Sequence, residues 1–391
     1  MIKKKKKLNF RKVISCIIIL FIFMIITINI NKKNKEKELT ILINNEFVET
    51  IHKVIIDEGE NIYFSKEDIQ KIFDETIYYN EAEKELITTY NTHVALLKIN
   101  EEYAVIDDEN IKLNGNLQEI DKRIYLPIKD LQKVYDIELE YTKENNRIII
   151  DSLLKEKREG YISKKTKLHE KKGFFDGKTL ENLIIGEKIF ILEDNGKYRK
   201  IRTSIGNIGY IKSKKISDEK IVRENVKYEK QEISLYENYS NIFGIYDNIS
   251  IDSNKLNVVS PTFFYIDTDS KVLDKTTSTT ATYSVYKNWT DSNGLQIMPG
   301  VTNTESVSST LLTFSQRSQA INSLKDLVIK HNYLGINIKF DSIDDINSFY
   351  RFLLELYPRF KRENLKVAIT LNDSNLEKNR LENVVDYIFD D

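Results

Sequence analysis

The chain has 391 residues, enough for two to four domains, and its formal net charge of −1 gives no basic face for nucleic acid. A single cysteine, Cys16, excludes a disulfide framework and a thiolate metal site. The four histidines lie far apart without HExxH spacing, so the sequence predicts no metal centre and no cofactor.

A cationic run precedes an apolar segment at the start of the chain. Lysines at 3–7, Arg11 and Lys12 come before residues 13–30, which carry no charge and are just long enough to cross a bilayer. A cleaved secretory signal would have a shorter apolar region, and no small-x-small cleavage site follows. The heavier positive charge predicts a cytoplasmic N-terminus. We therefore predict that residues 1–35 form a basic stub and an uncleaved, single-pass signal anchor in the cell membrane, with the rest of the chain extracytoplasmic.

An internal repeat lies within residues 38–152. Residues 62–88 and 124–150 align without a gap, and each copy reads as a strand, an amphipathic helix and a hairpin with a polar turn. The expected apolar helix faces are Ile69, Ile72 and Phe73 in the first copy and Leu131, Val134 and Tyr135 in the second. The two copies resemble the copper amine oxidase N-terminal-type domain of bacterial surface proteins, which holds no copper. The resemblance implies an α+β spacer or wall-contacting module.

Residues 160–217 change to closely spaced strands and turns. Asp194-Asn195-Gly196 predicts a hairpin turn, and Gly206 and Gly209 bracket a second tight connection. The short length, the expectation of about five strands and the ending GxIGYI resemble a bacterial Src-homology-3-type (SH3-like) all-β barrel. Such modules bind cell-wall peptides or glycans; a small structural barrel without a ligand is the alternative.

From residue 230 onward, apolar strands alternate with helical patterns, which predicts βα units and a parallel sheet. Strands are expected at 233–236, 257–266, 295–302, 334–340, 365–371 and 384–389. Helices are expected at 281–292, 316–330 and 345–360, the last with an Asp-rich start suited to an N-cap. We expect Trp289 and the aromatic residues of these helices to pack in the core.

Five of these strand motifs carry a resemblance to a known family. NVVSPTFF, GLQIMPGVTN, YLGINIKFD, LKVAIT and NVVDYIF occur in the order and spacing of glycoside hydrolase family 18, in its cell-wall and spore-associated branch. The resemblance covers residues 230–391 and implies an α/β (TIM-type) barrel with its chemistry at the C-terminal ends of the strands. It also implies a partner glycan that contains N-acetylglucosamine, such as chitin or peptidoglycan.

The fourth strand of that family carries the motif DGxDxDxE, and YLGINIKFD stands at its place. The family's Glu is the general acid, and the Asp two residues earlier orients the substrate N-acetyl group, whose carbonyl attacks the anomeric carbon. This route departs from the usual carboxylate pair. Residue by residue, the four acids of the motif correspond to Leu334, Asn337, Lys339 and Asp341, and its glycine corresponds to Gly335. Only the glycine is retained in kind.

These replacements have chemical consequences. Asp341 keeps an acid but reaches about 1.5 Å less far than Glu, and a misplacement of about 1 Å can cost on the order of a hundredfold in rate. Lys339 has donors only and puts a positive charge where an oxazolinium-like cation must develop. Asp341 is therefore the candidate acid, with Lys339 at the orienting position and Asn337 beside them. The alternative is an Asp341–Lys339 ion pair that caps a strand end.

The sequence shows six strands of the barrel and ends at VVDYIFDD, where the family's sixth-strand motif M-x-Y-D would stand. An unclosed parallel barrel would leave a long exposed sheet edge. Three explanations stay open: a truncated sequence, a partner protein that closes the barrel, or a degenerate remnant.

Three functions are open on this basis. The first is a membrane-anchored cell-surface pseudoenzyme that binds cell-wall glycan or peptidoglycan without cleaving it. The second is an active glycosidase, a hydrolase of O-glycosyl bonds with Asp341 as general acid. The third is a structural envelope scaffold that binds no glycan. The replaced acids favour the first, so we predict an impaired hydrolase.

Overall fold

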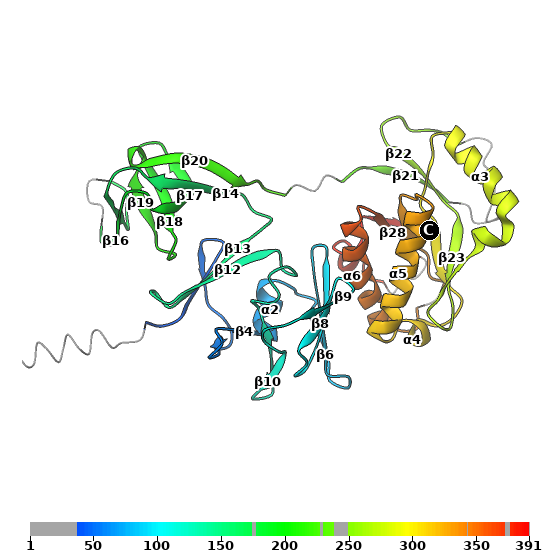
Figure 1. Ribbon diagram of the computed structural model, residues 1–391. Helices are drawn as coiled ribbons and strands as arrows, with labels where there is room; N and C mark the ends of the chain where they lie inside the picture. Colours follow the sequence, from blue (N-terminus) through cyan, green and yellow to red (C-terminus); the bar gives the residue numbers. More distant parts are fainter. Residues whose placement is uncertain are drawn as a thin grey trace, which may run out of the picture. The chain divides into compact units, whose positions relative to one another are not determined.

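The computed structural model describes residues 37–173, 177–226, 230–237, 249–341, 343–371 and 376–390. They form short strands in several separate sheets, with few helices (Figure 1). The chain divides into two compact units. The first runs to Glu49 and adds residues 139–151 and 158–220, and the second contains residues 50–138, 152–157 and 221–391. The predicted domain 38–152 thus gives its two ends to the first unit and its centre to the second.

In the first unit, the two ends of the segment 38–152 meet in one sheet. Its order is β12-β13-β1-β2, and β1 pairs with β13 in parallel. The tight β1–β2 turn uses Asn44 and Asn45, both with positive φ, which suits a two-residue hairpin. The strands are β1 (Thr40–Ile43), β2 (Glu46–Val48), β12 (Ile137–Thr142) and β13 (Arg147–Ser152).

The rest of the first unit is a seven-stranded sheet in the order β16-β15-β19-β18-β17-β14-β20. The hairpin predicted at Asp194-Asn195-Gly196 is confirmed: Gly196 has φ +70° and its N–H donates to Asp194 Oδ1 at 2.9 Å. The expectation of about five strands was too low, because β14 and β20 extend the sheet beyond residues 160–217. The strands are β14 (Lys157–Ile162), β15 (Thr166–His169), β16 (Thr179–Leu183), β17 (Lys188–Asn195), β18 (Tyr198–Thr203), β19 (Ile208–Lys212) and β20 (Ile216–Arg223), with the 3-10 turn η1 at Ser213–Lys215.

In the second unit, the two repeat copies pair through their first strands. β4 and β11 are antiparallel, with Phe64 opposite Leu126, which occupy equivalent positions in the two copies. The sheets have the orders β10-β11-β4-β3 and β5-β6-β7-β8-β9. The elements are β3 (Ile55–Ile56), β4 (Ile62–Ser65), α2 (Lys66–Ile72), β5 (Tyr78–Asn80), β6 (Glu85–Tyr90), β7 (His93–Lys98), β8 (Tyr103–Ile106), β9 (Glu109–Lys112), β10 (Gln118–Ile120) and β11 (Arg123–Pro127).

Only one of the two predicted repeat helices forms. The first copy forms α2, whose N-cap Ser65 accepts a hydrogen bond from the Asp68 N–H. In the second copy, consecutive turns follow Pro127, and the left-handed φ of Asp136 ends them before a regular helix is established. The predicted apolar face is nevertheless buried, since Leu131, Val134 and Tyr135 are fully enclosed.

His93 of β7 is held between two carboxylates of this segment. Its Nδ1 lies 2.7 Å from an Asp107 oxygen, and its Nε2 lies 3.6 Å from an Asp136 oxygen. The hydrogen bonds to Asp107 and Asp136 outweigh burial and raise the pKa of His93 from 6.5 to about 9. The charged imidazolium therefore stabilises the fold fully below about pH 6.5, and this contribution is lost as pH rises through about 9.

An NMR pH titration is expected to show a charged His93 imidazole at neutral pH and a midpoint near 9. A His93→Gln variant assigns the resonance. A midpoint near the ordinary value of about 6.5 would contradict the role given to the two carboxylates.

The barrel-like part of the second unit has strands at all six predicted positions. Two of the predicted strands are each split by a proline, Pro261 or Pro299, which has no N–H to donate to a neighbour. The strands form two sheets, in the orders β21-β22-β25 and β24-β23-β26-β27-β28-β29. All neighbours pair in parallel except β24, which pairs with β23 in antiparallel. The strands are β21 (Ile233–Glu237), β22 (Leu256–Ser260), β23 (Thr262–Ile266), β24 (Val272–Asp274), β25 (Gln296–Ile297), β26 (Gly300–Asn303), β27 (Gly335–Ile338), β28 (Lys366–Leu371) and β29 (Tyr387–Asp390).

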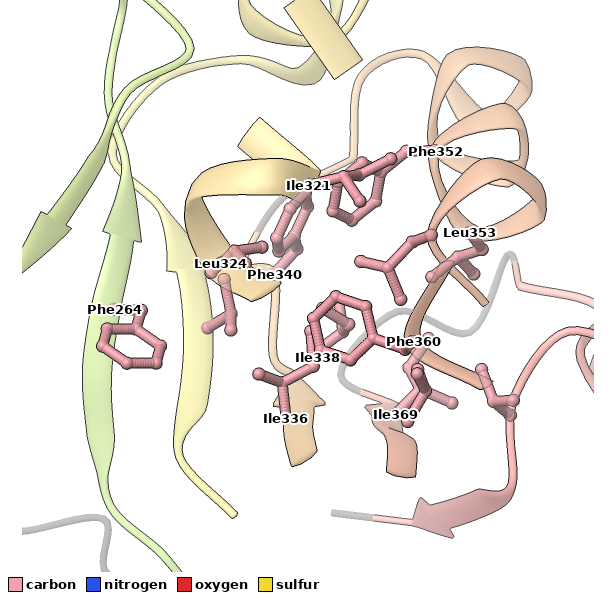
Figure 2. Close-up of a cluster of buried hydrophobic side chains, with 14 of the residues drawn as sticks. Phe264, Ile321, Leu324, Ile336, Ile338, Phe340, Phe352, Leu353, Phe360 and Ile369 are labelled. Atoms are coloured by element: carbon pink, nitrogen blue, oxygen red, sulfur yellow. The ribbon is translucent and has the colours of Figure 1, made fainter. Parts of the chain in front are cut away.

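The three predicted helices of this part are confirmed as α3 (Thr280–Ser292), α5 (Phe314–Lys330) and α6 (Ile346–Arg362). Thr313 and Gln316 form a capping box for α5, and Asp345 caps α6 as expected. Figure 2 shows side chains of the strands, such as Ile338 and Ile369, meeting side chains of the helices, such as Phe360. Short elements complete the segment: η2 (Lys275–Thr279), α4 (Val307–Thr310) and α7 (Lys378–Leu381).

A second, smaller apolar cluster lies on the other face of the parallel strands. It contains Val258, Met298, Ala368 and Tyr387. Tyr387 of the outer strand β29 also donates a hydrogen bond to the Gln231 carbonyl at 2.6 Å, just before the other outer strand, β21. This contact links the two ends of the parallel array through its interior, while a closing partner stays a prediction.

No helix in the described part of the chain is long and apolar enough to cross a membrane. The predicted span at 13–30 lies outside the described residues, and so does Cys16. The anchor and the extracytoplasmic location therefore stay predictions.

Candidate functional site

The predicted site residues alternate on β27 and the residues that follow it. Side chains two apart point to the same face of a strand, so Asn337, Lys339 and Asp341 share one face. Ile336 and Ile338 point to the opposite face, where they pack beneath the helices (Figure 2). The helices cover one face of the sheet, so the polar face of β27 is the interior face of the partial barrel.

Asn337 is fully buried in a hydrogen-bonded group that joins three strands. Its Nδ2 donates to Ser260 Oγ at 3.1 Å and to Thr370 Oγ1 at 3.0 Å. Ser260 ends β22 and Thr370 lies in β28, so one amide side chain ties its neighbours across the interior. Because buried polar groups are costly unless they are paired, this arrangement indicates a structural role for Asn337.

Lys339 lies directly above this group and is only 7% exposed. Its Nζ donates to the Ser260 carbonyl oxygen at 3.1 Å. Gly300 of β26 leaves room for the lysine stem, since a Cβ at that position would lie 3.2 Å from Lys339 Cδ. The ammonium therefore lies in the interior of the partial barrel.

Asp341 is exposed at the carboxyl end of β27. Its Oδ2 accepts a hydrogen bond from Thr302 Oγ1 at 3.3 Å. Lys339 turns inward to Ser260, whereas Asp341 lies at the rim. The alternative of an Asp341–Lys339 pair that caps the strand stays a prediction.

Tyr265 at the end of β23 faces this acid. Burial first, and then the negative charge of Asp341, raise the pKa of the Tyr265 phenol. The Lys275 ammonium lies 5.3 Å from the centre of the Tyr265 ring. The carboxyl ends of β23, β26 and β27 thus bring Tyr265, Thr302 and Asp341 together as a rim of an aromatic ring, a hydroxyl and a carboxylate.

Sequence reasoning did not single out four residues of this arrangement: Ser260, Tyr265, Thr302 and Thr370. A usable signal was present, because Ser260, Thr302 and Thr370 lie in the strand motifs quoted for the family resemblance and Tyr265 directly follows the first of these motifs. Polar residues at the carboxyl ends of neighbouring parallel strands meet at one edge of a sheet. Applying that rule to NVVSPTFFYI and GVTN would have placed Tyr265 and Thr302 beside Asp341.

The arrangement can bind a polar ligand, but it offers little for metal chemistry. Among the described residues, no three His, Cys, Asp or Glu side chains form a group that could hold a metal ion. The carboxylate at the rim can accept hydrogen bonds or donate a proton. The buried ammonium can only donate.

A separate cleft of about 530 Å³ lies elsewhere in the second unit, away from these residues. Two of its basic side chains, Lys98 and Arg317, are paired within the protein. Lys98 pairs with Glu85 at 2.9 Å, and Arg317 pairs with Glu355 at 2.7 Å.

A comparison with protein families matches one part of the chain. Residues 42–150 match the copper amine oxidase N-terminal domain family. The match includes both repeat copies, as the sequence predicted, and it ends before the seven-stranded sheet and the barrel-like segment. A comparison with curated proteins gave no match.

Chitinases and a spore cortex-lytic enzyme are among the solved structures that resemble the chain. A class V chitinase from Pseudomonas fluorescens Pf-5 is 17% identical, with a TM-score of 0.31, over 34% of this chain and 45% of that one. The Ostrinia furnacalis Group IV chitinase is 16% identical, with a TM-score of 0.32, over 41% of this chain and 51% of that one. The Bacillus cereus spore cortex-lytic enzyme SleL is 14% identical, with a TM-score of 0.31, over 55% of this chain and 57% of that one. The chain spans about half the length of each structure, and neither activity nor substrate transfers from them.

Proposed function

We propose that this protein is a membrane-anchored cell-surface protein that binds N-acetylglucosamine-containing cell-wall glycan and is impaired in hydrolysis. One observation carries the proposal. At the position of the family's orienting carboxylate stands Lys339, with its ammonium held 3.1 Å from the Ser260 carbonyl in the interior. The family resemblance of the strand motifs supplies the glycan class.

The chemistry of the site supports binding without efficient cleavage. Acetamide-assisted hydrolysis needs an acceptor for the substrate N–H and a negative environment for the developing cation. An ammonium supplies neither. Asp341 is shorter than Glu, and a carboxylate misplaced by about 1 Å loses on the order of a hundredfold in rate. At the rim, Asp341 is exposed, Tyr265 is half-buried and Thr302 is buried behind Asp341, so the rim still offers an aromatic ring and a carboxylate to a sugar.

The location belongs to the same proposal. The uncharged segment 13–30 behind a basic stub supports a single-pass anchor with the folded part outside the cytoplasm. A glycan ligand in the cell wall is consistent with that side of the membrane.

Sedimentation with purified peptidoglycan is expected to bring down the full-length, detergent-solubilised protein. Incubation with chito-oligosaccharides or peptidoglycan is expected to release no reducing ends above the buffer blank. The matched control is Asp341→Asn, which is isosteric and should give the same blank-level value. Protein that stays in the supernatant would contradict the glycan-binding proposal and favour the structural scaffold.

The second candidate function is an active glycosidase with Asp341 as general acid. The exposure of Asp341 at the rim favours this candidate, because a leaving oxygen could reach it. Release of reducing ends by the natural protein, abolished in Asp341→Asn, would establish it. Lys339→Asp combined with Asp341→Glu restores both acids of the family and is expected to raise any residual rate.

A further inference from the structure

Helix α6 is buried on more than one side. In a barrel of alternating strands and helices, the helices form an outer ring with one face toward water. The inner face of α6 packs Phe352, Leu353 and Phe360 toward the strands (Figure 2). Two charged residues of the same helix, Glu355 and Arg359, are also only 1% exposed. A helix that buries charged residues in this way must be covered by another folded element.

Strands of residues 50–138, which belong to the same compact unit, cover this side of α6. The helix packs against β6 and β7. The Arg351 guanidinium lies 3.5 Å from the centre of the Tyr78 ring, which is a close stacking contact. Ile87 of β6 and Leu354 of α6 line one small cavity of about 10 Å³, together with the buried Glu355. The contact therefore has apolar, stacked and buried polar parts.

The C-terminal turn of α6 is held by acidic hairpin residues. Arg362 pairs with Asp107 at 2.6 Å, and Arg359 pairs with Asp108 at 3.2 Å. Burial by itself raises the pKa of Asp107. The hydrogen bond and charge of His93 and the charge of Arg362 outweigh burial and lower this pKa to about 2. Against burial, the charge and hydrogen bonds of Arg359 also lower the pKa of Asp108. These pairs are partly buried, so solvent screens them less than surface pairs.

We propose that residues 50–138 are a folded support for the barrel-like segment, which holds α6 against the parallel strands. This role differs from the spacer that the family resemblance implies. It also stands independently of the proposed glycan binding, since it concerns the outer face of the helices and not the interior face of the strands. In consequence, the two segments unfold together.

The single tryptophan of the chain, Trp289 in α3, makes the test direct. It packs against the core of the barrel-like segment, so its fluorescence changes when that segment unfolds. The test variant of the full chain is Asp107→Asn with Asp108→Asn. Both residues have positive φ in the β8–β9 turn, and asparagine tolerates that conformation. The thermal midpoint reported by Trp289 is expected to fall by at least about 3 °C, although both changes lie in the other segment.

The matched control is Asp121→Asn. Asp121 also has positive φ in a hairpin turn, between β10 and β11, and is exposed. Its variant is expected to leave the Trp289 midpoint unchanged. Arg362→Gln approaches the same contact from α6, and combining it with Asp107→Asn is expected to lower the midpoint by less than the sum of the two single changes. An unchanged Trp289 midpoint in the double aspartate variant, or strictly additive shifts, would overturn the proposal.

Discussion

Replacing Gly335 with alanine is expected to abolish folding of the barrel-like segment. Gly335 opens β27 and pairs with Lys366 of β28. An added Cβ would lie 1.8 Å from the Lys366 carbonyl oxygen and 2.6 Å from its backbone nitrogen. Overpacking against movable side chains typically costs about 1–3 kcal/mol, but here the obstacle is the backbone of the neighbouring strand. The cost therefore exceeds that range, and the two strands must separate.

The measurement is Trp289 fluorescence together with circular dichroism of purified Gly335→Ala. The expected result is an exposed tryptophan and no cooperative transition. Gly59→Ala is the control, because its nearest neighbours would be the side-chain ends of Asn61 and Asp57, at 3.2 and 3.3 Å. A cooperatively folded Gly335→Ala protein would show that the close approach of β27 and β28 is not required. The result also bears on the family resemblance, because this glycine is the one motif residue retained in kind.

Replacing Arg317 with methionine is expected to lower the free energy of unfolding by about 3–5 kcal/mol, because it leaves a buried carboxylate unpaired. The Arg317 Nε and Nη2 groups donate to Glu355 Oε1 at 2.9 and 2.7 Å. Both side chains are 2% exposed. Burial raises the pKa of Glu355 even with Arg317 present, and removal of the arginine raises it further.

The sign of the pH dependence follows from that raised pKa. A carboxyl group that holds its proton more tightly in the folded state stabilises the fold at low pH and loses this effect as pH rises. The loss in free energy of unfolding caused by Arg317→Met is therefore expected to be larger at pH 8 than at pH 5. Urea denaturation followed by Trp289 fluorescence measures both values.

A double variant supplies the control for this pair. Arg317→Met with Glu355→Leu removes both charges, and apolar replacements of buried ion pairs are often neutral or stabilising. The double variant is expected to recover most of the lost stability. A single variant that costs less than about 1 kcal/mol at both pH values would mean that water reaches the pair, in conflict with its burial.

Much of the barrel-like segment was predictable from local pattern. Apolar alternation located the six strand positions, and the spacing of Ile321, Leu324 and Val328 located α5. The hairpin at Asp194-Asn195-Gly196 followed from turn chemistry. The second repeat helix was predicted wrongly for a reason that is also local. The spacing of Leu131, Val134 and Tyr135 fits the apolar face of a helix, but consecutive turns bury these side chains equally well.

The sequence by itself determined the periodic elements, the repeat and the presence of Asn337 and Lys339 at positions where the motif that the strand resembles has acids. Only the tertiary structure decided where the side chains of this strand point. Asp341 meets Thr302, 39 positions away, and Lys339 meets Ser260, 79 positions away. Burial of Arg359 against Asp108 spans 251 positions. Periodicity and turn chemistry are properties of neighbouring residues, whereas these contacts depend on strand order and on which segment covers a helix, and local pattern carries no information about either.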